Sequence, residues 1–172
     1  MAARRQVLLL GGGVLATLGL PQLLRAAPVE TIEMKGTARG EHVWFAPVGL
    51  AVPVGTTVRF VNRDPGNSHT ATAYHPEVFD RARRIPKGAA PWDSDFLLPG
   101  ESFEVMLSAP GVYDYYCIPH EMAGMVGRIV VGQPGEPGWQ GPVPVTEDLD
   151  PAALAAFPQV DEILARGRVV KG

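Results

Sequence analysis

Short apolar runs separated by Gly, Pro and polar residues extend from residue 29 to residue 131. In several runs apolar and polar positions alternate, which is the pattern of strands that bury one face. Glycines at positions 55, 100 and 111 fall between runs and indicate turns. Many short strands of this kind are typical of an antiparallel β-sandwich, so we predict an all-β fold. The predicted strands are 29–34, 43–47, 56–62, 68–74, 102–107, 111–117 and 127–131.

The run 111–117 also predicts which side chains face the core. Successive residues of a strand point to opposite faces. Tyr113 and Tyr115 therefore share a face with Cys117, whereas Tyr116 points to the other side. Aromatic residues dominate the interiors of β-sandwiches, so we expect Tyr113 and Tyr115 to be core residues.

The composition changes after Gly132. Pro and Gly are frequent from residue 133 onward, as in a linker. Asp150 as a cap and Pro151 at the first helical position then predict a helix over 152–166, which Pro158 could divide. We expect its apolar stripe to pack on the sandwich, with partner binding as the alternative. The stripe comprises Leu154, Phe157, Val160, Ile163 and Leu164.

Residues 1–27 have the features of an export signal. Arg4 and Arg5 precede an apolar, Gly-containing stretch, and Ala26 and Ala27 offer a processing site. The adjacent arginines are similar to those of a twin-arginine signal, although no strict A-x-A site is present. We therefore expect a periplasmic or otherwise exported protein with no membrane span once the signal is removed. A peripheral or anchored form is the alternative, because residues 7–24 approach the roughly 20 residues that cross a bilayer.

The charge balance excludes one class of partner. The chain has 15 Lys and Arg against 18 Asp and Glu, and residues 1–27 contain Arg4, Arg5 and Arg25 but no acid. The mature chain would keep 12 basic residues against the same 18 acids, a net charge of −6. Nucleic-acid binding needs a basic face, so no nucleic-acid partner is expected. The single Cys cannot form an internal disulfide, and metal ligation best explains an unpaired thiol in an exported protein.

A set of soft-metal ligands lies on one loop. From Tyr113 to Gly127 the chain reads Y-D-Y-Y-C-I-P-H-E-M-A-G-M-V-G, with Cys117 three residues before His120 and eight before Met125. A lone Cys or Met is usually a core residue. A thiolate, an imidazole and a weak thioether, completed by a second imidazole, form instead the trigonal site that selects copper for electron transfer. The combination on one loop favours the copper site.

These residues resemble the ligand loop of the blue copper proteins, or cupredoxins, and most closely that of the plastocyanin and pseudoazurin branch. The resemblance covers residues 32–132 and includes the run that ends at Asn62. It implies a Greek-key cupredoxin domain at 28–132, followed by the linker and C-terminal helical extension at 133–172. It also implies one type 1 copper ion, with Cys117, His120 and Met125 as ligands.

The fourth ligand must come from the remaining histidines. His69 follows Asn62 by seven residues, which matches the strand end, loop and histidine of the family. We therefore predict His69. His75 is the alternative if its strand stays regular, whereas His42 is expected to be solvated.

Three further roles follow from the resemblance or from charge. Asn62 is expected to hydrogen-bond beside Cys117 and hold its loop, with a simple turn as the alternative. Tyr116 would offer a second electron exit, with packing as the alternative. Residues 76–91 are predicted to be an insertion of helix or irregular loop. Its basic residues form a solvated face or dock an acidic partner beside the copper site. They are Arg81, Arg83, Arg84 and Lys87.

The resemblance implies a monomeric carrier of single electrons between a redox donor and acceptor of the cytochrome, oxidase or reductase type. We do not expect an enzyme, because the sequence has one Cys and lacks the H-x-H motifs of multicopper oxidases. Two alternatives stay open. One is a copper delivery or storage protein, to which Met122 beside Met125 would contribute, and the other is a mononuclear copper protein with an open catalytic or sensing site.

Overall fold

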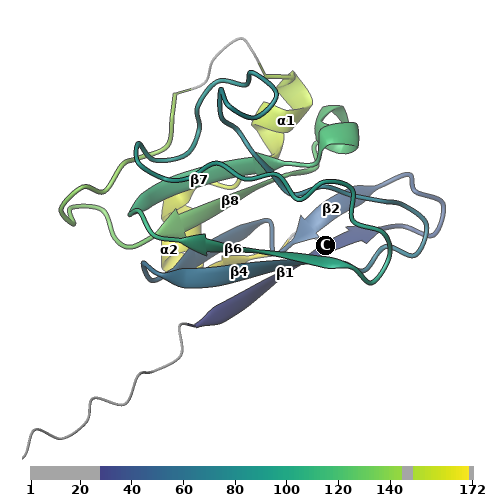
Figure 1. Cartoon of the computed structure of the whole chain (residues 1–172), viewed down its shortest axis with the longest axis horizontal. Helices are drawn as coiled ribbons and strands as arrows, with labels where there is room; N and C mark the ends of the chain where they lie inside the picture. Colours follow the sequence, from purple (N-terminus) through teal and green to yellow (C-terminus); the bar gives the residue numbers. More distant parts are fainter. Residues whose placement is uncertain (1–27, 145–148, 171–172) are drawn as a thin grey trace, which may run out of the picture.

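Two β-sheets pack face to face (Figure 1). The computed structural model describes residues 28–144 and 149–170, so the predicted export signal at 1–27 lies outside the described residues. One sheet has the strand order β2-β1-β4-β6 and the other β5-β7-β8-β3-β9. The predicted all-β sandwich is confirmed. The strands are β1 (Val29–Gly36), β2 (Val43–Ala46), β3 (Gly49–Val52), β4 (Thr56–Asn62), β5 (Thr72–Ala73), β6 (Ser102–Leu107), β7 (Gly111–Tyr116), β8 (Val126–Val131) and β9 (Arg168–Val169).

The sheets differ from the prediction in three respects. They are mixed rather than wholly antiparallel, because β1 pairs with β4 and β3 pairs with β8 in parallel. The short strands β3 and β9 were not predicted. The strand predicted over 68–74 was too long, since only β5 forms and His69 pairs with Leu97 through an isolated bridge. Just before β5, the backbone N–H groups of Thr70 and Ala71 donate to side chains, Cys117 Sγ and Ser94 Oγ, instead of to a neighbouring strand, so no regular ladder forms there.

Two short helices follow the sandwich, α1 (Pro151–Ala156) and α2 (Val160–Arg166). The Asp150 carboxylate accepts a hydrogen bond of 2.8 Å from Ala152 N–H and starts α1 as predicted. The helix predicted over 152–166 is divided, because the chain is extended at Phe157 and Pro158 lacks the N–H that would continue it. None of the helices in the described part of the chain has the length and hydrophobicity needed to span a bilayer.

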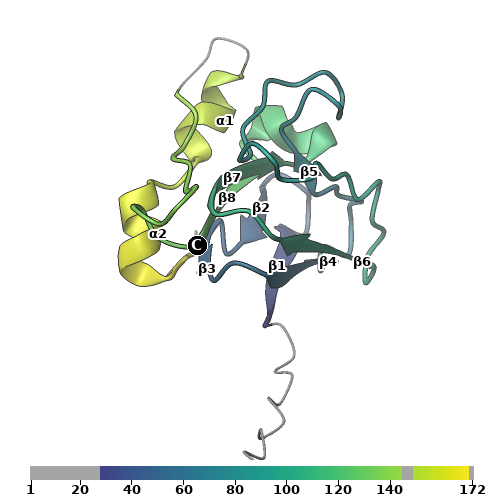
Figure 2. The same cartoon turned by 60° about the vertical axis from the view of Figure 1, so that its left-hand side comes forward.

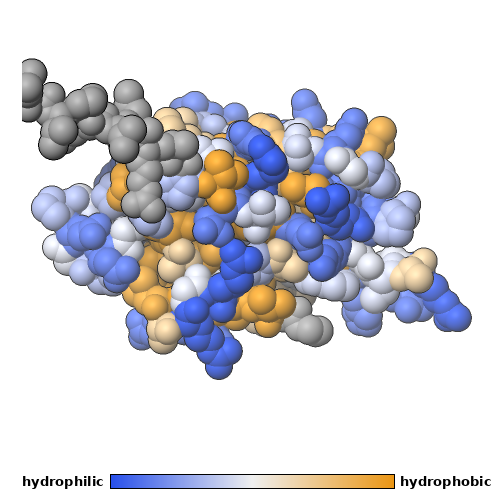
Figure 3. Space-filling view, turned by 90° about the horizontal axis from the view of Figure 1, so that it is seen from below, coloured by the Kyte–Doolittle hydropathy of each residue, from blue (hydrophilic) through white to orange (hydrophobic). Residues whose placement is uncertain are grey.

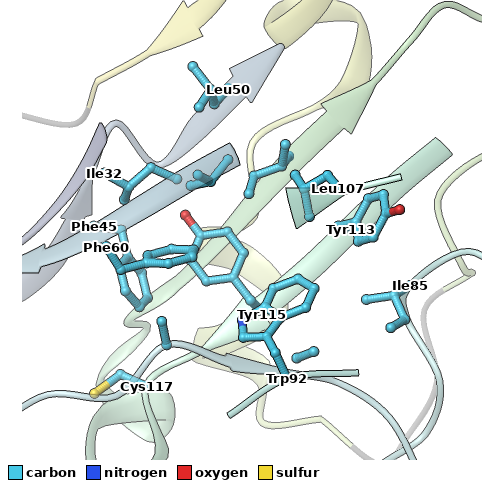
Figure 4. Close-up of a cluster of buried hydrophobic side chains, with 14 of the residues drawn as sticks. Ile32, Phe45, Leu50, Phe60, Ile85, Trp92, Leu107, Tyr113, Tyr115 and Cys117 are labelled. Atoms are coloured by element: carbon cyan, nitrogen blue, oxygen red, sulfur yellow. The ribbon is translucent and has the colours of Figure 1, made fainter. Parts of the chain in front are cut away.

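The main core lies between the two sheets. Tyr115 contacts Phe45 and Phe60 edge-on, with ring centroids 4.8 and 5.1 Å apart, and Figure 4 shows these rings with Cys117 at the margin of the cluster. Tyr113 and Tyr115 are both buried in this cluster, which confirms their predicted core role. The strand β7 thus connects the packed core directly to the cysteine.

The outer face of the second sheet is also covered. In Figure 2, α1 and α2 lie beside this sheet, on the side away from β1, β4 and β6. One apolar cluster joins Tyr116 of β7 to Phe157, and a second joins Val130 of β8 to Ile163 of α2. The outer face of the first sheet carries polar and apolar side chains intermixed at the surface (Figure 3). The two apolar clusters show that the C-terminal apolar stripe packs on the second sheet of the sandwich, as predicted.

A buried ionic cluster holds the insertion and the C-terminal segment against the outer face of this sheet. Asp114, on the outer face of β7, accepts hydrogen bonds from Arg84 Nε at 3.0 Å and from Arg128 Nε at 2.7 Å. The guanidinium group of Arg128 also donates to the Pro158 carbonyl at 3.0 Å, and both guanidinium groups lie over the Phe157 ring. One carboxylate thus joins the insertion, the sheet and the C-terminal segment.

Candidate metal centre

Three predicted ligand side chains converge at one end of the sandwich. The Nδ1 atoms of His69 and His120 are 3.2 Å apart, and Cys117 Sγ lies 3.6 Å from His69 Nδ1 and 3.4 Å from His120 Nδ1. Transition-metal bonds to nitrogen and sulfur of about 2.0–2.3 Å would separate such ligand atoms by roughly 3.3–3.8 Å. The observed separations therefore suit one small ion between them. Among the described residues, this cluster does not include the other two histidines.

The loop from Asn62 to His69 is held by its own side chains. Asn62 Nδ2 donates to the carbonyls of Asn67 and Leu97, both at 2.8 Å. His69 exchanges backbone hydrogen bonds with Leu97, which fixes the ring at the edge of the core. Asn62 thus holds the loop of the first histidine, whereas the expected contact beside Cys117 comes from another residue.

That residue is Thr70. Its backbone N–H donates to Cys117 Sγ at 3.3 Å, and its hydroxyl accepts from Ile118 N–H at 2.8 Å. Burial raises the pKa of the Cys117 thiol to about 11, although the hydrogen bond from Thr70 acts in the opposite direction. A hydrogen bond to sulfur favours the thiolate, which is the form that binds metal. The sequence offered no signal for Thr70 beyond its place after His69.

The second imidazole is carried by a 3₁₀ helix, η1 (Ile118–Ala123). Cys117 N–H donates to the Met125 carbonyl at 3.0 Å, and Met125 N–H donates to the His120 carbonyl at 3.1 Å. Gly124 ends η1 with a φ of 78°, a left-handed conformation that glycine adopts without strain. The backbone of the loop therefore ties all three of its predicted ligands together.

Met125 and Met122 have opposite environments. Met125 is fully buried in the same apolar cluster as Cys117. Met122 is 76% exposed on η1, two residues after the partly exposed His120. Burial and the neighbouring His69 lower the pKa of His120, so the His120 imidazole is neutral and available as a ligand near neutral pH. Of these two methionines, Met125 is thus the one buried with Cys117.

A carboxylate stands behind the first histidine. Asp64 Oδ2 lies 2.9 Å from His69 Nε2, and both side chains are buried. Burial opposes ionisation of Asp64, but hydrogen bonds from Asn67, Gly66 and His69 together hold its pKa below the ordinary value. Asp64 was not predicted from the sequence, where it appears only as a polar residue of a loop.

The insertion at 76–91 contacts the ligand loop. It is irregular rather than helical. Arg81 forms a bidentate ion pair with Glu121 of η1, and Tyr74 O–H donates to the same carboxylate at 2.7 Å. Arg84 is buried against Asp114. Two of the four basic residues are therefore used inside the protein, so the predicted solvated or docking face is smaller than the sequence indicated.

The predicted second electron exit is closed. The Tyr116 ring stacks on Tyr74 at a centroid distance of 4.3 Å, and Arg81 lies over both rings. Only 3% of Tyr116 is exposed. This residue has the packing role that was the alternative expectation. His75 also has a structural role, because its Nδ1 accepts a hydrogen bond from Glu77 N–H.

The chain is similar to known copper proteins. Residues 32–132 match the family of copper binding proteins described as plastocyanin/azurin. The chloroplastic plastocyanin of Chlamydomonas reinhardtii is 43% identical over 91 residues, which are 51% of this chain and 57% of that protein. The plastocyanin of Prochlorothrix hollandica is 36% identical over 115 residues, covering 63% of this chain and 80% of the relative. The chain thus spans less than two thirds of the first of these relatives.

A pseudoazurin structure from Sinorhizobium is 32% identical, with a TM-score of 0.47 over 62% of this chain and 76% of that one. The family match, by contrast, covers more than half of the sequence and includes the converging residues His69, Cys117 and His120. It confirms the predicted blue copper resemblance and copper as the cofactor. The chain belongs to the plastocyanin/azurin family of copper-binding proteins.

Proposed function

We propose that this protein carries single electrons between redox proteins through one type 1 copper ion. The ligands are His69, Cys117 and His120, with Met125 as the weak axial ligand. The observation that carries the proposal is the convergence of two imidazole nitrogens and one buried sulfur within 3.2–3.6 Å of one another. When bound in such a set, copper cycles between Cu(I) and Cu(II).

The protein contributes a fixed ligand geometry. Thr70 orients the cysteine sulfur, the Leu97 pairing fixes His69, and the closed backbone of the loop fixes His120. Ligands that do not move between oxidation states keep the reorganisation energy of electron transfer small. This rigidity supports a carrier, because a delivery protein must release its metal.

The electron leaves through the edge of His120. Its ring is partly exposed, and the exposed Pro119 and Met122 flank it on η1. The other family route would pass through Tyr116, which is buried here. A small apolar surface around His120 suits brief contact with a cytochrome-type donor and an oxidase- or reductase-type acceptor.

We also propose that the protein is exported. The support is the Arg4-Arg5 pair, the apolar stretch that follows it and the alanines at 26 and 27. Mass spectrometry of the secreted or periplasmic protein should find a new N-terminus near residue 27. Recovery of the intact first residues in the membrane fraction would favour an anchored form instead.

The visible absorption spectrum of the copper-loaded protein tests the site. We expect an intense band toward the red end, from charge transfer between thiolate and copper, and its complete loss in Cys117→Ser. His69→Ala should abolish the band and His75→Ala should retain it. Loss only with His75→Ala would contradict the ligand assignment.

Two rates then separate a carrier from a copper donor. We expect fast electron exchange with a small cytochrome and slow loss of copper to a modest chelator, because a thiolate and two imidazoles hold the metal tightly. Copper loss within minutes together with slow exchange would support delivery.

Met125→Leu should keep the colour and raise the reduction potential, whereas the exposed Met122→Leu should leave the potential unchanged.

A further inference from the structure

The carboxylate behind His69 is part of a built site. Asp64 is 1% exposed, and its Oδ2 accepts hydrogen bonds from His69 Nε2 at 2.9 Å and from Asn67 Nδ2 at 2.8 Å. Its Oδ1 accepts from Gly66 N–H at 2.9 Å. These donors fix the carboxylate in one orientation, with Oδ2 directed at the back of the imidazole.

The space for this carboxylate depends on a glycine in another strand. A Cβ atom on Gly36, at the end of β1, would lie 2.0 Å from Asp64 Oδ2. No other residue type could occupy position 36 without displacing the carboxylate. Strand β1 and the loop after β4 together therefore position the contact with His69.

The charge of Asp64 has no fixed counterion. In residues 28–144 and 149–170, the one ion-pair partner of Asp64 is His69, which is charged only when protonated. The other buried carboxylates near the sheet differ, because Asp114 and Glu121 are paired with arginines. A buried negative charge is unfavourable unless a positive charge lies nearby. A metal ion held by His69 Nδ1 would place such a charge on the far side of the His69 ring.

We propose that Asp64 is a positioning residue of the copper centre that also favours its oxidised form. The carboxylate holds His69 with the proton on Nε2, which leaves the Nδ1 lone pair facing Cys117 and His120. Its negative charge interacts more favourably with Cu(II) than with Cu(I), so it lowers the reduction potential. This inference depends on the proposed function, since it assumes copper at the site.

The Asp64→Asn variant tests the effect of the negative charge, because it removes the charge while keeping the size and shape of the side chain. The amide oxygen can still accept from His69 Nε2, while the negative charge is removed. At an ambient potential equal to the midpoint of the unmodified protein, we expect the ratio of reduced to oxidised copper to rise about tenfold, which corresponds to about 59 mV for one electron. The visible band should persist. A ratio that changes less than twofold, with the band intact, would overturn the charge effect.

Gly36→Ala provides the complementary change. It retains the charge of Asp64 but displaces Oδ2 from His69, so the hydrogen bond should be lost while the potential moves less than in Asp64→Asn. An exposed acid, Glu101→Gln, is the control for general electrostatics and should leave the ratio within twofold. A shift as large as that of Asp64→Asn in this control would show that the effect is not specific to Asp64.

The tautomer of His69 can be determined by NMR in the unmodified protein, without copper redox chemistry. In ¹⁵N-histidine-labelled protein loaded with Zn²⁺, we expect His69 to show a slowly exchanging Nε2–H and a metal-bound Nδ1. A proton on Nδ1 would overturn the positioning role. If the copper protein showed no reversible one-electron reduction, the proposed function would fail, while the zinc measurement would still decide the role of Asp64.

Discussion

The two sheets of the sandwich bury their side chains differently. In the sheet of β1, β2, β4 and β6, the strand β6 alternates between covered and exposed positions. In the other sheet, every residue of β7 and β8 is buried. The difference comes from the insertion and the C-terminal segment, which cover the outer face of the second sheet and leave the outer face of the first sheet open. The sheet that leads into Cys117 is therefore enclosed on both faces.

The segments that cover the second sheet, which are the insertion at 76–91 and the C-terminal helices, also support the metal centre. The ion pair of Arg81 with Glu121 connects the insertion to η1, and the stacked Tyr74 and Tyr116 rings lie beneath it. Residues that are not ligands thus brace the loop that carries His120. The same residues bury Tyr116, whereas His120 stays partly exposed.

Breaking the buried ionic cluster on the covered sheet should lower the free energy of unfolding more than any other change considered for the two sheets. Asp114→Ala leaves Arg84 and Arg128 buried without a counterion, so we expect the free energy of unfolding to fall by about 3–5 kcal/mol. Urea denaturation of the metal-free protein measures this loss.

The control is Glu104→Ala on the open sheet, which removes the partner of Arg59. Since this pair is about half exposed, its loss should cost about 0.2–1 kcal/mol. Similar losses in both variants would contradict the proposed fastening of the cover.

Truncating one apolar side chain of the cover should have a somewhat smaller effect. Ile163 of α2 is fully buried on the outer face of the second sheet, next to Gly49. Ile163→Ala should destabilise the fold by about 2–4 kcal/mol, because it removes buried surface and leaves a cavity. Met106 of β6 occupies the outer face of the open sheet and is 62% exposed. Met106→Ala should change the free energy of unfolding by less than about 0.5 kcal/mol. Equal effects in thermal denaturation would mean that the segment is only loosely attached.

The smallest effect concerns two tyrosines on the inner face of β7. Tyr113 O–H donates to the Ala109 carbonyl at 2.7 Å, whereas the buried Tyr115 hydroxyl has no partner among the described residues. Tyr113→Phe should therefore destabilise the protein by about 0.5–1.5 kcal/mol. Tyr115→Phe should be neutral or stabilising by about 1 kcal/mol, since it removes an unsatisfied polar group. Destabilisation by Tyr115→Phe in the same urea titration would reveal a hydrogen bond that this structure does not contain.

Local patterns account for the parts of the fold that the sequence predicted. The bounds of β4 and β6 match because each strand alternates clearly and follows a glycine turn. The loop ligands were predicted because Cys117, His120 and Met125 are close in sequence, whereas His69 required the family resemblance. The strands β3 and β9 were missed because they have only 4 and 2 residues and pair with distant partners. Asp64 could not be predicted, because its role depends on Gly36 in a separate strand.

The short strand β9 has a consequence for behaviour at high concentration. It pairs antiparallel with β3 at the margin of the second sheet, with Gly49 opposite Val169. The unpaired backbone groups of an edge strand are a template for addition of a second chain, and natural proteins cover or interrupt such edges. Arg168 further places a charge there and bonds to Glu30. Strand β9 therefore covers the edge of β3 and makes intermolecular strand pairing at β3 less favourable.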